Sequence, residues 1–193
     1  MTGKNLFHKE DARNPPDWNW HLTRGYTKDE CRPVFAAIAA SPDFWLGLHE
    51  EPGCSTLRMC VLDLMRYHDL YFVTNRMGAD AKWQTEQWLI LHLGIERPTV
   101  LISGMKGLVA KALNLDCYID DNADNANDVV EQTLPPLMPS QAIVEDVVFV
   151  DNRKPSCRTY LLNRSYNVNV PVSAHITRVA TVGTFLDAEL VNL

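Results

Sequence analysis

The stretch CYIDDNADN places two adjacent aspartates, Asp120 and Asp121, directly after an apolar run. Carboxylates at this spacing repel each other, and the segment from residue 116 to 130 contains no Lys or Arg to offset their charge. A bound Mg²⁺ would relieve the repulsion, because it is usually held by one or two carboxylates together with phosphate oxygens. The same residues also fit a solvated turn in which Asn122 caps the next helix, and both interpretations stay open.

Two other apolar runs end in residues suited to a phosphate group. The run LYFVT, residues 70–74, ends in Thr74, and Lys106 follows the run TVLIS, residues 99–103. Because ligands bind beyond the carboxyl ends of parallel strands, we expect both residues to converge with the aspartate pair. Thr74 is suited to donate to a phosphoryl oxygen, and Lys106 to neutralise its charge. Taken singly, they also fit a strand-end hydroxyl and a surface cation at a helix start.

The elements that must position these residues alternate along the chain. Helices are predicted at 56–67, 79–93, 106–113 and near 184–190, and strands at 70–74, 99–103, 117–120, 147–151 and 158–162. The Pro-containing segment EQTLPPLMPSQAIVED, residues 131–146, is predicted to be irregular. Alternation of this kind is typical of a doubly wound parallel sheet, so we expect an α/β core over residues 54–193.

The first part of the chain has a different character. Residues 1–53 are rich in Trp, Pro and charged residues, and Pro52 and Gly53 close this region. A helix is predicted at 27–40, because Thr27 and Glu30 form the pattern of a capping box. We therefore expect a small helical domain over residues 1–53.

Composition excludes several classes of protein. The chain has 193 residues, 46% of them hydrophobic, which is enough for one sizeable core, and its formal net charge of -6 argues against binding of duplex nucleic acid. The five cysteines are scattered without a C-x-x-C pair, as expected in a reducing compartment. No apolar run approaches the roughly 20 residues that span a membrane. We expect a cytoplasmic protein without a membrane partner.

The order of these motifs resembles the haloacid dehalogenase (HAD-like) superfamily of phosphatases, and within it the 5'(3')-deoxyribonucleotidase-like branch. The likeness rests on YFVTNR, GMKGLVAKALNLD and CYIDDNADN in that order, on the later RTYLLNRSYN, and on the Trp-bearing N-terminal region, which resembles the small helical cap of those enzymes. The resemblance implies a HAD-like Rossmannoid parallel sheet and hydrolysis of a phosphomonoester through an aspartyl-phosphate, with Mg²⁺ as cofactor. Thr74 and Lys106 would act on the phosphoryl group, and Asp120 and Asp121 would hold Mg²⁺.

The resemblance also implies contacts with a substrate. Asn75 and Arg76 adjoin Thr74 and would touch a small phosphorylated compound, for which a deoxynucleoside monophosphate is a candidate. A homodimer is one assembly consistent with such a protein, although no sequence feature selects it.

One motif of the superfamily is missing. Its nucleophile belongs to an N-terminal D-x-D motif on the central strand, and no D-x-D occurs in this chain. We therefore expect the first core strand to be absent, as a truncated or misassigned start would produce. Alternatively, Asp151 at the end of the predicted strand 147–151 offers an acid, although Arg153 then stands where a second acid belongs and the strand order must change. Asp63, within a predicted helix, is a weaker candidate.

Three functions follow from these observations. The first is a Mg²⁺-dependent phosphomonoester hydrolase of the 5'-nucleotidase type, present here as a truncated or incomplete copy. The alternative is a catalytically inactive HAD-like protein that keeps the phosphate and metal pocket. The third is a phosphatase acting on nucleic-acid ends, against which the acidic charge weighs.

Overall fold

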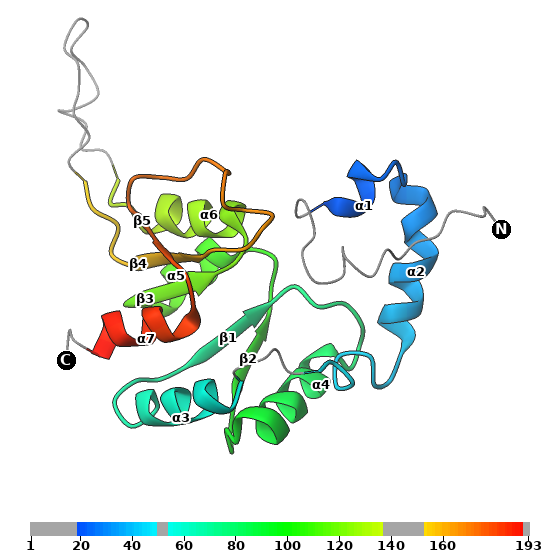
Figure 1. Ribbon diagram of the computed structural model, residues 1–193, viewed down its shortest axis with the longest axis horizontal. Helices are drawn as coiled ribbons and strands as arrows, with labels where there is room; N and C mark the ends of the chain where they lie inside the picture. Colours follow the sequence, from blue (N-terminus) through cyan, green and yellow to red (C-terminus); the bar gives the residue numbers. More distant parts are fainter. Residues whose placement is uncertain (1–18, 50–53, 137–152, 191–193) are drawn as a thin grey trace, which may run out of the picture. The chain divides into compact units, whose positions relative to one another are not determined.

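The computed structural model describes residues 19–49, 54–136 and 153–190 (Figure 1). Over these residues the chain is an α/β protein with two small parallel sheets, consistent with a Rossmann-like core. The chain forms two compact units, one of residues Met1–Gly104 with Thr181–Leu193 and one of residues Met105–Ala180. The expected domain boundary near residue 53 lies outside the described residues and stays a prediction.

The first unit contains a two-stranded parallel sheet. Strand β1 (Tyr71–Thr74) pairs with β2 (Thr99–Ile102), and the chain between them forms α4 (Ala81–Trp88), which continues as the π-helix η1 (Leu89–Leu93). Gly94 ends η1 with a φ of 70°, in the left-handed region that glycine adopts most readily. The predicted strands and the helix at 79–93 are therefore found, with a π-turn that the periodicity did not predict.

Further helices complete the first unit. Helix α3 (Cys54–Leu64) packs against η1, and α7 (Val182–Leu190) contacts α3. The core here is formed by the buried side chains of Val61, Leu89, Leu93, Ile95 and Val100. Burial of these apolar side chains stabilises the unit by removing them from water.

The N-terminal helices are α1 (Trp20–Thr23) and α2 (Lys28–Ala40). The predicted capping box is confirmed, because the Glu30 N–H donates to Thr27 Oγ1 at 3.2 Å and the Thr27 N–H donates to Glu30 Oε2 at 2.8 Å. The segment after α2 is joined to α4, since the Trp45 N–H donates to Gln84 Oε1 at 2.8 Å and Gln84 Nε2 donates to the Ser41 carbonyl at 3.0 Å.

The second unit contains a three-stranded parallel sheet in the order β3-β4-β5. Its strands are β3 (Cys117–Asp120), β4 (Arg158–Leu162) and β5 (Ile176–Val179), and its helices are α5 (Lys106–Leu113) and α6 (Ala123–Thr133). Helices α5 and α6 pack closely on each other, and α6 also contacts all three strands. The buried side chains of Ala110, Tyr118, Val129 and Cys157 join α5, β3, α6 and the residue that precedes β4 in one cluster.

The described strands pair in two separate sheets, because β2 and β3 share no hydrogen-bonded ladder. The expected absence of the central strand would divide a sheet in this way, and it stays a prediction. One prediction about the elements needs correction. Helix α6 runs to Thr133 and so includes the first residues of the segment expected to be irregular, whereas most of that segment and the predicted strand at 147–151 lie outside the described residues. Among the helices that the structure describes, none has the length and apolar character needed to cross a bilayer.

Candidate functional site

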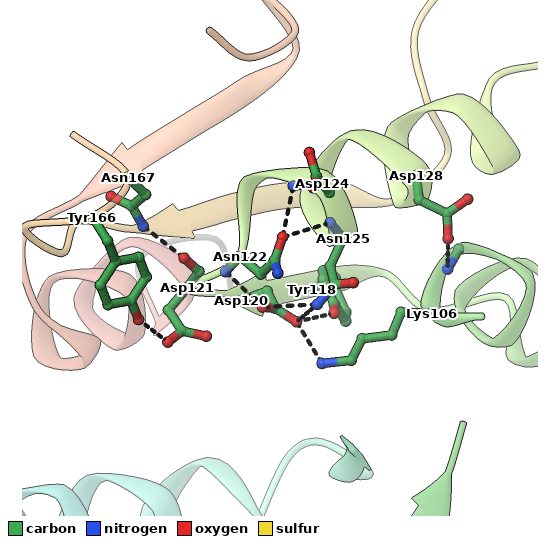
Figure 2. Close-up of polar contacts among 11 residues, drawn as sticks. Lys106, Tyr118, Asp120, Asp121, Asn122, Asp124, Asn125, Asp128, Tyr166 and Asn167 are labelled. Carbon is green, nitrogen blue, oxygen red and sulfur yellow. Dashed lines mark hydrogen bonds and ion pairs between the residues drawn. The ribbon is translucent and has the colours of Figure 1, made fainter. Parts of the chain in front are cut away.

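The two adjacent aspartates lie in the second unit, where β3 ends and α6 is about to begin (Figure 2). Asn122 caps α6, because its Oδ1 accepts the N–H groups of Asp124 at 2.8 Å and of Asn125 at 3.3 Å. The turn with a capping asparagine is thus present. It fixes the backbone that presents both carboxylates at the carboxyl end of β3.

Lys106 lies beside the first of these carboxylates. It is the first residue of α5, the helix that precedes β3, and its Nζ is 2.8 Å from Asp120 Oδ2. A helix that leads back into a parallel strand runs opposite to it, so the helix start and the strand end lie at the same edge of the sheet. Both side chains are largely buried, 13% exposed for Lys106 and 6% for Asp120. The structure therefore brings together two residues that sequence order alone placed at one edge.

Asp120 accepts hydrogen bonds from several further donors. Tyr118 donates its hydroxyl to Oδ2, the Asn122 N–H donates to Oδ1 at 2.8 Å, and Asn125 Nδ2 lies 3.3 Å from Oδ1 and 3.2 Å from Oδ2. Burial raises the pKa of Asp120, but the charge and hydrogen bond of Lys106, with those of Tyr118 and Asn122, outweigh burial and hold the pKa below its ordinary value. Asp120 is therefore a stable, well-satisfied anion.

Asp121 has a different environment. Tyr166 donates its hydroxyl to Asp121 Oδ2, and Asn167 Nδ2 donates to the Asp121 carbonyl at 2.7 Å. Burial and the neighbouring charge of Asp120 raise the pKa of Asp121 above its ordinary value, although the hydrogen bond from Tyr166 works in the opposite direction. Among the described residues, Lys106 pairs with Asp120 and no cation pairs with Asp121. Over the part of the chain that the structure describes, the cluster thus carries one partly buried carboxylate that lacks a compensating positive charge.

The other predicted site residues belong to the first unit. Thr74 ends β1, and its carbonyl accepts the Ser103 N–H at 2.9 Å. Asn75 is exposed, and its side chain lies against Gly104, which has no side chain to displace it. The expected convergence of Thr74 and Asn75 with the aspartate pair stays a prediction.

Arg76 is held within its own unit. Its guanidinium lies 5.1 Å from the centre of the Trp45 ring and donates to Thr85 Oγ1 at 3.0 Å. Burial lowers the pKa of Arg76. The contact with substrate expected for Arg76 stays a prediction, and the contacts that the structure gives it are those of a side chain that ties β1 to α4 and to the segment after α2.

Neither alternative nucleophile gains support. Asp151 lies outside the described residues. Asp63 lies in α3, is about half exposed, and has Arg66 at 3.5 Å as an ion-pair partner one turn along the chain. The described surroundings of this exposed carboxylate contain no feature that would make it a better nucleophile, so Asp63 is interpreted as an ordinary surface residue.

Sequence reasoning did not find the residues that complete the site. Tyr118 carries a signal, because residues two apart on a strand face the same side, and Asn125 lies one helical turn beyond the aspartates. Tyr166 and Asn167 are far from the aspartates in sequence. Only the pairing of β4 beside β3 brings them to the site, and no local spacing predicts that pairing.

Fold and site together define an α/β chain in which a buried Lys-Asp ion pair and a second carboxylate lie at the carboxyl end of a parallel strand. Comparison with models of protein families gives no match for this chain, and comparison with curated proteins finds no similar sequence.

The environment of Asp121 gives a prediction about pH. Replacing Asp121 with Asn should raise the free energy of unfolding at neutral pH in the absence of divalent ions, because a neutral amide still accepts the Tyr166 hydroxyl but removes a partly buried charge beside Asp120. The folded-state pKa of Asp121 lies above the unfolded one, so the native carboxyl destabilises the fold above that pKa and ceases to do so as it protonates. The gain should therefore vanish as the pH falls below the unfolded-state value of about 3.9.

Urea unfolding of both proteins in a chelating buffer, at neutral and at acidic pH, measures this difference. A loss of stability in Asp121→Asn at neutral pH would show instead that the charged form of Asp121 is favoured by the fold. Asp124→Asn is a suitable control, because Asp124 is exposed at the start of α6.

Proposed function

We propose that this chain is a Mg²⁺-dependent phosphomonoester hydrolase of the HAD-like superfamily, of the 5'(3')-deoxyribonucleotidase-like type. The observation that carries the proposal is the buried pair of Lys106 and Asp120 beside Asp121, at the carboxyl end of β3. Ligands of parallel α/β sheets bind at this end of the strands. An ammonium group and two carboxylates at one point suit a phosphate group and a divalent cation.

The donor set of the cluster fits Mg²⁺. Among the described residues no group of three or more Asp, Glu, His or Cys side chains is arranged to hold a metal ion. Mg²⁺ does not need one, because it is commonly bound by one or two carboxylates and completes its shell with water and substrate oxygens. Asp121 would be the principal ligand, since Asp120 is already occupied by several donors. The bound cation would draw charge from the phosphoryl oxygens.

The chain's own residues would prepare the phosphate for attack. Lys106 has three N–H donors, of which Asp120 takes one, so the ammonium is held in place and keeps donors for phosphoryl oxygens. In the proposed reaction an aspartate oxygen forms a bond to phosphorus while the bond to the substrate's ester oxygen breaks, and that oxygen takes a proton from a second, protonated carboxylic acid, which like the nucleophile is not assigned. Water then cleaves the aspartyl-phosphate and gives a proton back to that second carboxylate, which releases inorganic phosphate and restores the nucleophile.

The nucleophile of this reaction is not assigned, because the chain has no D-x-D motif. One feature of the fold accommodates a nucleophile strand. Among the described strands, β3 pairs only with β4 and β1 only with β2, so each has an edge without a described partner. The central strand of the HAD-like arrangement would require such an edge.

A second candidate function is binding of a phosphate and a metal ion without hydrolysis. The absence of the D-x-D motif favours it, since Lys106, Asp120 and Asp121 are present although no motif supplies the nucleophile. The acidic net charge continues to weigh against a third function on nucleic-acid ends.

Phosphate release from a deoxynucleoside monophosphate with Mg²⁺ tests the proposal. We expect release by the wild-type chain and its loss in Asp121→Asn, whereas Lys111→Met, at an exposed position of the same helix as Lys106, should retain it. Loss in Asp151→Asn as well would identify Asp151 as the nucleophile. Binding of inorganic phosphate and Mn²⁺ without release would favour the second function, and absence of both binding and release would exclude the two together.

A further inference from the structure

Tyr166 connects a distant loop to the aspartate pair. It lies between β4 and β5, and its hydroxyl donates to Asp121 Oδ2 (Figure 2). A tyrosine hydroxyl ordinarily carries its proton at neutral pH, so Tyr166 is the donor in this hydrogen bond and Asp121 the acceptor. Among the described side chains, Tyr166 is the one that donates to the carboxylate of Asp121.

The loop that carries Tyr166 is held on both sides. The next residue, Asn167, is 2% exposed, and its Nδ2 donates to the Asp121 carbonyl at 2.7 Å and to the Leu162 carbonyl at 2.8 Å. Arg178 on β5 donates to the carbonyls of Asn167 at 3.2 Å and Val170 at 2.6 Å. These contacts fix the loop backbone to β4, to β5 and to the turn after β3. The Tyr166 ring is therefore presented from a rigid frame.

The two tyrosines of the site differ in how far the carboxylate that each one contacts depends on it for its orientation. Tyr118 donates to Asp120, but Asp120 is also held by Lys106 and by the Asn122 N–H. Apart from its own backbone N–H, the donor that the described residues supply to the Asp121 carboxylate is the Tyr166 hydroxyl, so the orientation of this carboxylate depends largely on Tyr166. Removing the Tyr166 hydroxyl should therefore loosen the Asp121 carboxylate, whereas removing the Tyr118 hydroxyl should leave the Asp120 carboxylate in place.

We propose that Tyr166 is a positioning residue that orients the Asp121 carboxylate for binding of a divalent cation. This inference rests on the proposed function of the same site. A ligating carboxylate that accepts a hydrogen bond on one oxygen presents its other oxygen to the metal in a fixed direction. Tyr166 itself does not touch the metal or the substrate; it acts through Asp121.

Mn²⁺ binding tests this role without any measurement of catalysis. Free Mn²⁺, counted by electron paramagnetic resonance, gives the dissociation constant of each variant, and Mg²⁺ competition relates it to the proposed cofactor. We expect Tyr166→Phe to bind Mn²⁺ about tenfold more weakly, the lower end of the loss seen when an outer-shell partner of a metal ligand is removed. Tyr118→Phe should lose less. Tyr67→Phe, at a position 63% exposed, is the matched control and should bind as the wild type does.

A near-ultraviolet difference spectrum separates positioning from a purely structural role. Binding of Mg²⁺ to Asp121 changes the charge that the Tyr166 hydroxyl faces, so the wild-type and Tyr118→Phe proteins should show a tyrosine difference signal that Tyr166→Phe lacks. Thermal unfolding identifies a variant that has lost its fold. If Tyr166→Phe does not fold, Arg178→Lys loosens the same loop and should weaken Mn²⁺ binding in the same direction.

The outcomes are distinguishable. If the wild type binds Mn²⁺ and a folded Tyr166→Phe binds it equally well or more tightly, the role of Tyr166 is overturned while the proposed function stands. If the wild type binds no divalent cation, the proposed metal site is wrong, and the inference about Tyr166 is overturned with it.

Discussion

Replacing Lys106 with Met should lower the free energy of unfolding by about 3 kcal/mol, at the lower end of the range for breaking a buried ion pair. The Lys106 and Asp120 side chains are 13% and 6% exposed, so the remaining carboxylate would stay buried without its cation. Hydrogen bonds from Tyr118 and Asn122 still reach Asp120, which is why the lower end applies. Urea unfolding at neutral pH, with two-state analysis, measures the loss.

A matched variant and a double variant test whether the uncompensated charge of Asp120 causes this loss of stability. Lys111→Met changes an exposed lysine of the same helix and should alter the free energy of unfolding by less than about 0.5 kcal/mol. Adding Asp120→Asn to Lys106→Met removes the uncompensated charge, so the double variant should recover most of the lost stability. A double variant as unstable as Lys106→Met would mean that the lysine stem, through packing, is what stabilises the unit. Under the proposed function the double variant is folded but releases no phosphate.

The Lys106 and Asp120 contact could be predicted because it follows from chain direction. In a helix-strand unit of a parallel sheet the helix starts at the edge where its strands end, so LVAKALNL read as a helix and CYID as a strand place the two residues together. The capping box at Thr27 and Glu30 was predictable for a similar reason, since a cap is a local interaction between residues three apart.

Strand pairing and long-range contacts could not be predicted in the same way. An apolar run such as LYFVT indicates a strand but not its neighbour, so the sequence did not indicate that β3 would pair with β4 and β4 with β5. The strand β5 was missed because ITRV has two polar residues between its apolar ends, so neither an apolar run nor a strict alternation marks it as a strand.

The same limit applies to side chains. The contact of Arg76 with substrate stays a prediction, whereas its contacts with Trp45 and Thr85 join distant segments and could not be predicted from its place after Thr74. Tyr166 reaches Asp121 only because β4 lies beside β3. The position of a residue at a strand end can be predicted from the local sequence, but the residue that its side chain contacts depends on packing between distant segments.

Replacing Gly107 with Ala should lower the free energy of unfolding by about 1–3 kcal/mol, although alanine ordinarily stabilises a helix relative to glycine. A Cβ at Gly107 would lie 2.5 Å from the Asp128 carbonyl oxygen and 2.7 Å from Asp128 Oδ2, so α5 and α6 would have to separate. The Gly107 N–H also donates to Asp128 Oδ2 at 2.7 Å, and this hydrogen bond would be strained or lost. Thermal and urea unfolding measure the effect.

Two further variants test whether the clash with the backbone is the cause. Gly183→Ala in α7 meets only Thr181 Oγ1 at 3.5 Å, so it should be neutral or stabilising by up to about 1 kcal/mol. Adding Asp128→Ala to Gly107→Ala removes the carboxylate but leaves the carbonyl oxygen at 2.5 Å, so it should not restore stability. Recovery in that double variant would place the conflict in the Asp128 side chain instead. Because Gly107 follows Lys106 directly, displacement of the α5 start should also weaken binding of inorganic phosphate by the folded variant, which links the packing of two helices to the proposed chemistry of the site.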